Sequence, residues 1–222
     1  MAKPAALVSW SSGKDSAYAL AEIRRAGQLE IAGLLTTFTT TYDRVAMHGV
    51  RRELVQRQAQ AVGTLLFAVE LPSPCSNEAY ECVLGDTLLR ARAEGVTRVV
   101  FGDLYLEDIR AYREAQLAAL GMTCVFPLWG RETAELAREM VTAGLRARLT
   151  CVDPRQLDRS FAGRTFDADL LRDLPPTVDP CGERGEFHTF ATDGPMFAAS
   201  IAVRAGEIVE RDGFVFADVF PA

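Results

Sequence analysis

The chain has 222 residues, of which 49% are hydrophobic, and a formal net charge of −6. This composition excludes a mainly disordered chain. The acidic balance argues against non-specific nucleic-acid binding, and no stretch approaches the roughly 20 consecutive apolar residues of a membrane span. The five cysteines form no CxxC pair, so we expect free thiols and a cytoplasmic protein.

Apolar runs and amphipathic stretches alternate along the first half of the chain. The apolar runs, which are typical of buried strands, lie at residues 5–10, 31–37, 65–69, 98–101 and 124–126. The amphipathic stretches predict helices at 16–26, 51–62, 77–93 and 108–120. A glycine closely follows each helix, as is common at helix C-termini. This alternation predicts an α/β fold with a five-stranded parallel sheet that helices cover on both faces.

The pattern changes after about residue 127. One more helix is expected at 132–143 and one more strand at 148–152, and several prolines follow with short elements between them. Residues 196–204 and 208–216 flank Ala205-Gly206-Glu207 and predict a β-hairpin. We therefore expect a larger N-terminal domain over residues 1–127 and a smaller C-terminal α+β lobe over residues 128–222.

The segment Ser11-Ser12-Gly13-Lys14-Asp15-Ser16 lies where the first strand turns into the first helix. The free N–H groups and the dipole of a helix N-terminus attract anions, and small residues let the backbone approach a phosphate closely. Of the 24 basic residues 22 are arginine, so a lysine here is not an arbitrary surface charge. The segment is not a Walker A motif, because Val8 stands in the place of its first glycine. We predict a phosphate loop, with Ser16 as a helix cap.

This loop resembles the Ser-Gly-Gly-Lys-Asp-Ser loop of the N-type ATP pyrophosphatases, which are adenine nucleotide α-hydrolase-like enzymes that cleave ATP between the α and β phosphates. Ser12 stands where that superfamily usually has glycine. Within the superfamily the chain is similar to the diphthine–ammonia ligase family and its bacterial relatives over about residues 7–217. The similarity is carried by segments 102–110, 127–130 and 179–190, of which 179–190 is the most family-specific, whereas 103–110 departs from the archaeal and eukaryotic ligases. The resemblance implies a HUP/Rossmann-like sheet of order 3-2-1-4-5, a nucleotide-binding domain over residues 1–127 and a substrate lobe over residues 128–222.

The resemblance also implies an ATP-dependent ligase. A substrate carboxylate would attack the α-phosphate, an acyl-adenylate and Mg-pyrophosphate would form, and ammonia or another amine would displace AMP to give an amide. The expected cofactors are ATP and Mg²⁺. The expected partners are ammonia and a carboxylate acceptor, either a small molecule or a protein residue such as diphthine; a homodimer is compatible with the sequence. The alternative is a non-catalytic ATP or AMP sensor on the same fold.

The implied strand order makes the first and fourth strands neighbours, so Lys14 and Asp103 should face one crevice at the carboxyl edge of the sheet. Asp103 is expected to hold Mg²⁺ or to act as a general base, whereas Asp108 is expected only to cap the next helix. Thr36 and Gly102 end the second and fourth strands and are expected, with residues 11–16, to contact the nucleotide.

The segment from 179 to 194 concentrates glycine, glutamate, cysteine and histidine between two prolines. The resemblance implies that it closes the active cleft opposite the nucleotide. Glu186 or Glu183 is then expected to take the proton of the incoming amine, with Glu186 as the first choice. His188 is expected to orient the acceptor, and His48 to contact substrate or nucleotide.

Three other interpretations of this segment stay open. In the first, Phe187 and Phe190 anchor the segment in the core as a loop that is otherwise exposed to solvent. Cys181, the two glutamates and His188 would form a zinc site, although no second cysteine or histidine stands at zinc spacing. Cys181 would act as a covalent nucleophile, which requires an activating partner.

Overall fold

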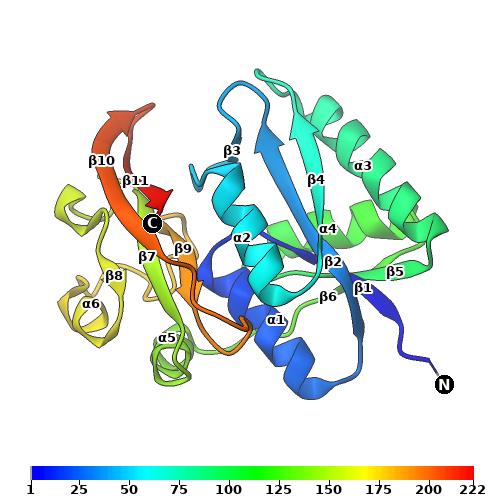
Figure 1. Cartoon of the computed structure of the whole chain (residues 1–222), viewed down its shortest axis with the longest axis horizontal. Helices are drawn as coiled ribbons and strands as arrows, with labels where there is room; N and C mark the ends of the chain where they lie inside the picture. Colours follow the sequence, from blue (N-terminus) through cyan, green and yellow to red (C-terminus); the bar gives the residue numbers. More distant parts are fainter. Residues whose placement is uncertain (1) are drawn as a thin grey trace.

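The computed structural model describes residues 2–222 and contains two β-sheets that lie side by side, with helix α1 at their boundary (Figure 1). The first sheet is formed by β1 (Ala5–Ser9), β2 (Glu30–Thr39), β3 (Arg44–Val45), β4 (Leu65–Leu71), β5 (Val96–Val100) and β6 (Thr123–Val125). Four helices belong to this part: α1 (Lys14–Ala26), α2 (Arg52–Val62), α3 (Asn77–Ala93) and α4 (Glu107–Ala119).

The strand order confirms the prediction from the resemblance. The parallel strands run β4-β2-β1-β5-β6, which is 3-2-1-4-5 when they are counted along the chain. The order reverses beside β1, so the carboxyl ends of β1 and β5 open a crevice of the kind that binds ligands in such sheets. The short β3 was not predicted; it pairs antiparallel with the end of β2.

Helices cover both faces of this sheet, as predicted. Side chains alternate along β1, so Ala6 and Val8 join the core that contains α1 and α2, while Leu7 joins the core beneath α3 and α4. A strand that is buried on both faces explains why β1 is an uninterrupted apolar run in the sequence.

The second sheet confirms the smaller α+β lobe. Its strands are β7 (Arg146–Val152), β8 (Thr165–Phe166), β9 (Phe187–Asp193), β10 (Val203–Arg211) and β11 (Phe214–Pro221). Strand β10 pairs with β11, and β7 pairs with β11, β8 and β9. All these pairs are antiparallel. Helices α5 (Thr133–Thr142) and α6 (Ala168–Asp173) and a 3₁₀ turn (Arg159–Phe161) complete this part.

The predicted hairpin exists, but its turn was predicted in the wrong place. The chain reverses at Asp212-Gly213, where both residues have positive φ of 52° and 80°. Asp-Gly is a favoured pair for a two-residue hairpin turn. Ala205-Gly206-Glu207, the predicted turn, is instead a register shift inside β10.

Helix ends follow the capping rules only in part. Gly27 and Gly63 cap α1 and α2 in the left-handed conformation that favours glycine. Asp108 does not cap α4, because the helix begins at Glu107 and Leu106 takes the cap position. Asp108 lies in the first turn, where its carboxylate interacts favourably with the positive end of the helix dipole. None of the helices within residues 2–222 is long and apolar enough to cross a membrane.

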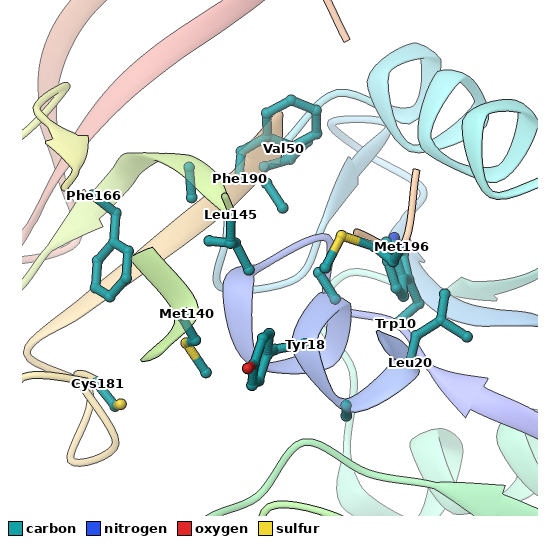
Figure 2. Packing of buried hydrophobic residues seen from close by; sticks show 14 of the residues in the cluster. Trp10, Tyr18, Leu20, Val50, Met140, Leu145, Phe166, Cys181, Phe190 and Met196 are labelled. Atoms are coloured by element: carbon teal, nitrogen blue, oxygen red, sulfur yellow. The ribbon is translucent and has the colours of Figure 1, made fainter. Parts of the chain in front are cut away.

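One hydrophobic core joins the two sheets. Trp10 and Leu20 from the N-terminal part pack in the same cluster as Phe190 and Met196 from the C-terminal part (Figure 2). The two sheets therefore share buried surface.

A buried glutamine ties the loop after β1 to β9. Gln58 is fully buried on α2, accepts a hydrogen bond from Trp10 Nε1 at 2.8 Å and donates through Nε2 to the carbonyls of Ser12 at 3.0 Å and Ala191 at 2.8 Å. The Ala191 N–H in turn donates to the Ser12 carbonyl at 2.9 Å. This set of bonds holds the predicted phosphate loop against a strand of the other sheet.

We predict that Gln58→Leu lowers the free energy of unfolding by about 2–4 kcal/mol, because it leaves buried polar groups of Trp10 and Ala191 without their partner. Urea denaturation should show a lower midpoint with an unchanged slope. Gln60→Leu on the exposed side of the same helix is the matched control. Equal midpoints for the two variants would contradict the stabilising role of the Gln58 hydrogen bonds.

Candidate active site

The predicted phosphate loop connects β1 directly to α1. Gly13 is the N-cap of α1, and Ser12 before it has a φ of 70°. A side chain in this left-handed region costs roughly 1–2 kcal/mol, which explains why the loop that it resembles has glycine there. The Ser12 hydroxyl is buried and has no hydrogen-bond partner within residues 2–222. Ser16 is not the cap; its hydroxyl donates to the Gly13 carbonyl at 3.1 Å.

The end of β5 lies against the first turn of α1. A Cβ atom on Gly102 would lie 2.8 Å from the carbonyl carbon of Asp15 and 2.8 Å from the amide nitrogen of Ser16. Because these are backbone atoms, only glycine allows this approach. Gly102 therefore keeps the Asp103 segment beside the predicted phosphate loop.

Lys14 is almost fully buried and reaches across to the C-terminal part. Its Nζ donates to Asp15 Oδ2 at 2.8 Å and to the Cys181 carbonyl, and it lies 5.3 Å from the centroid of the Phe187 ring. Burial alone would lower the pKa of Lys14, but Asp15, with smaller contributions from Cys181 and Glu183, outweighs it, so the pKa lies above its ordinary value. The lysine is thus a fixed positive charge.

Thr189 on β9 completes the helix N-terminus and was not among the predicted site residues. Its Oγ1 accepts the backbone N–H of Lys14 at 3.0 Å. The same strand leaves little room beside Gly13, where a Cβ would lie 3.2 Å from the Thr189 carbonyl. Sequence offered no signal for this contact, because 175 residues separate Lys14 from Thr189.

A small cavity of about 240 Å³ gathers most of the predicted site residues. From the N-terminal part it is lined by Ser11, Lys14, Asp15, Ser16, His48, Gly102 and Asp103, and from the C-terminal part by Glu183 and His188. Ser12, Gly13, Thr36 and Glu186 are not part of its lining. The Thr36 hydroxyl instead donates to the Trp10 carbonyl at 2.8 Å, so it serves the fold.

The two glutamates of the C-terminal segment have different surroundings. Glu186 is buried, and its two oxygens accept the backbone N–H groups of Asp179 and Arg184, both at 2.9 Å. Glu183 faces the cavity and accepts one N–H, from Leu104 at 2.8 Å. Burial raises the pKa of Glu183 to about 7. Glu186 therefore shapes the loop, while Glu183 is the carboxylate placed to exchange a proton near neutral pH.

His48 and His188 pack against each other in the wall of the cavity, with ring centroids 4.6 Å apart and ring planes tilted by 40°. Burial lowers the pKa of His48 to about 3 and that of His188 to about 4, so both rings are neutral at pH 7. His48 Nδ1 lies 3.1 Å from the Thr189 carbonyl. Because a carbonyl only accepts, this nitrogen carries the proton and Nε2 keeps its lone pair.

Asp103 lies in the crevice beside Lys14, as predicted, but it already has a partner. Arg113 on α4 forms an ion pair with it at 2.8 Å, and the Arg113 guanidinium lies 4.5 Å from the Phe101 ring centroid. Arg113 was not among the predicted site residues.

The structure supports neither alternative for Cys181. Burial raises the pKa of this thiol, so it is protonated and a poor nucleophile at neutral pH. Within residues 2–222 no three or more of the histidine, cysteine, aspartate and glutamate side chains gather as a metal site. The described residues therefore do not supply the ligand cluster that the zinc interpretation requires.

A larger cavity of about 660 Å³ adjoins the small one and shares Ser11, His48 and Arg113 with it. It lies at the carboxyl ends of β1, β2 and β5, beneath α3 and α4, and its walls are largely apolar. One site thus combines an apolar chamber, a helix N-terminus with a buried lysine, and a carboxylate that titrates near neutral pH. This combination suits a phosphorylated ligand and proton transfer beside it.

Comparison with known proteins agrees with the resemblance seen in the sequence. The family model of the diphthamide synthase N-terminal domain matches residues 3–124, and that of the diphthamide synthase C-terminal domain matches residues 132–218. The diphthine–ammonia ligase of Homo sapiens is 26% identical over 239 residues, covering 97% of this chain and 88% of the human protein. The diphthine–ammonia ligase of Danio rerio is 29% identical over 229 residues, covering 94% and 90%. This chain therefore belongs to the diphthamide synthase family.

Proposed function

We propose that this protein is an ATP-dependent ligase that activates a carboxylate as its adenylate and converts it to an amide with ammonia. The observation that carries the proposal is that Lys14, at the start of α1, and Glu183, from the other lobe, line one cavity of about 240 Å³. An anion site and a base at one place are what the two steps require. The full-length relatives named above are ligases, and nothing in the site favours a non-catalytic sensor.

ATP fits the two adjoining cavities in one orientation. Its triphosphate lies over residues 11–16, where the N-terminus of α1 and Lys14 stabilise negative charge. Its base and ribose extend into the apolar cavity beneath α3 and α4, whose volume of about 660 Å³ is in the usual range for a ligand of this size.

The carboxylates of the small cavity fit a magnesium ion. Asp15 Oδ1 is buried and has no hydrogen-bond partner in the described part of the chain. A buried carboxylate oxygen without a partner is costly unless it meets a cation or a donor. Asp15, with Asp103 beside it, would hold Mg²⁺, which when bound neutralises charge on the pyrophosphate.

The chain's own residues support two successive steps. In the first, the acceptor carboxylate attacks the α-phosphate, the bond to the β-phosphate breaks, and Lys14 stabilises the charge that develops on the leaving pyrophosphate. In the second, ammonia attacks the acyl carbon, Glu183 takes its proton, and AMP leaves. The two neutral histidines, which pack against each other, exclude water from the adenylate between the steps. The catalytic role predicted for Glu186 passes in this scheme to Glu183.

Diphthine is the acceptor that the names of the relatives indicate, and we propose it for this chain. Ammonia would be the second substrate. The described cysteines are all free, which agrees with a cytoplasmic location.

We predict that Lys14→Met lowers the rate of pyrophosphate release about a hundredfold, because the variant loses the preorganised positive charge that stabilises the leaving pyrophosphate. The assay follows pyrophosphate from ATP with a diphthine-bearing acceptor. Lys3→Met is the matched control, since Lys3 is the only other lysine and is exposed. Wild-type turnover by a folded Lys14→Met variant would disprove the role of the loop.

We predict that amide formation rises with pH through about 7, because Glu183 must be ionised to take a proton and its pKa is raised to about 7. Hydroxylamine, a much weaker base than ammonia, replaces it so that most of the nucleophile is unprotonated near pH 7 and above. Glu183→Gln should remove the rise and slow amide formation on the order of a hundredfold or more. Survival of the same pH profile in this variant would show that another group is the base.

A further inference from the structure

The larger cavity contains one polar side chain whose purpose the fold does not explain. Gln116 lies on α4 and lines this cavity. Its Nε2 atom is buried and has no hydrogen-bond partner within residues 2–222. An amide donor left unpaired in a protein interior is unfavourable and rare, so a ligand in the cavity is the simplest reason for its presence.

A neighbour on the same helix face differs from Gln116, because its polar group does have partners within the protein. Arg113, one turn earlier, lines the same cavity but is held by Asp103 and by the Phe101 ring. Its charge is thus already paired within the protein. Gln116 alone of the two offers its polar group to whatever enters the cavity.

The walls around Gln116 define the shape and polarity of that ligand. Leu35, Leu84, Leu88 and Val99 line the cavity from the sheet and from α3. Apolar walls suit the faces of a flat ring, and the shared lining with the small cavity places such a ring within reach of the phosphate loop.

An amide group presents one donor and one acceptor side by side, and it can turn over to suit its partner. Adenine offers the complement at its N6 amino group and N7, which glutamine binds as a pair, whereas guanine offers two acceptors at O6 and N7. We propose that Gln116 selects the adenine base of ATP through this paired hydrogen bond. The inference rests on the proposed use of ATP and names the residue that sets its base specificity.

The test combines a change in the protein with a change in the nucleotide. Dissociation constants are measured calorimetrically for ATP, for 7-deaza-ATP, which lacks the N7 acceptor, and for GTP. The wild type should bind ATP roughly tenfold to a hundredfold more tightly than either analogue. Gln116→Leu should weaken ATP binding and bring the three constants together, while Gln56→Leu, at an exposed position of α2, should keep the wild-type ratios.

A steady-state readout separates specificity from a structural effect. Gln116→Leu should raise the KM for ATP and leave kcat near the wild-type value, since the bond to the base is the same in the ground state and the transition state. The variant also removes a buried unpaired donor, so it should unfold at the wild-type temperature or above.

The exposed thiols report where the base binds. Cys75 lines the larger cavity and Cys82 does not, and both are exposed. ATP should slow alkylation of Cys75 and leave that of Cys82 unchanged.

Three results would overturn the inference. If Gln116→Leu keeps the wild-type preference for ATP over 7-deaza-ATP and GTP, another residue selects the base. If ATP does not protect Cys75, the base lies outside this cavity. If the wild type binds ATP without any such preference, Gln116 makes no bond to the base; if it binds no ATP, the proposed function fails as well.

Discussion

The site depends on the hydrogen bonds between the loop after β1 and strand β9. Gln58 and the Ala191 amide both bind the Ser12 carbonyl, and Thr189 accepts the Lys14 amide. These groups are buried, so breaking one bond exposes polar atoms to an apolar interior at a cost of about 1–3 kcal/mol. Strand β9 and Gln58 on α2 therefore together hold the loop with Ser12 in its left-handed conformation. The conformation of the proposed phosphate loop therefore depends on contacts from both lobes.

This constraint explains how the proposed catalytic groups from two lobes reach one small cavity. Lys14 binds the Cys181 carbonyl, and Glu183 accepts the Leu104 amide, so each lobe orients a charged group of the other. Glu186 contributes indirectly, by holding the amides of the loop that carries Glu183. Burial then sets the protonation states. It raises the pKa of Glu183 into the neutral range and keeps the two histidines uncharged.

Local patterns predicted the parallel sheet, its helices and the position of the phosphate loop, because strand period, capping glycines and small residues at a strand–helix junction act over a few neighbours. The turn at Asp212-Gly213 carried such a signal and was overlooked. The distinction between Glu183 and Glu186 carried none, since it depends on which backbone amides the folded loop presents. The partners of Asp103 and Lys14 are likewise set by packing between distant segments, which single-sequence patterns do not contain.

Hydrogen–deuterium exchange tests most directly whether the loop and β9 form one unit. Peptides that cover residues 10–16 and 187–193 are compared in the free protein and with ATP and Mg²⁺. The account predicts that both peptides open at the same rate when free and gain similar protection when ATP binds, because the amides of Lys14 and Ala191 are linked through Ser12 and Thr189. Protection that rises in the first peptide while the second exchanges as before would contradict it.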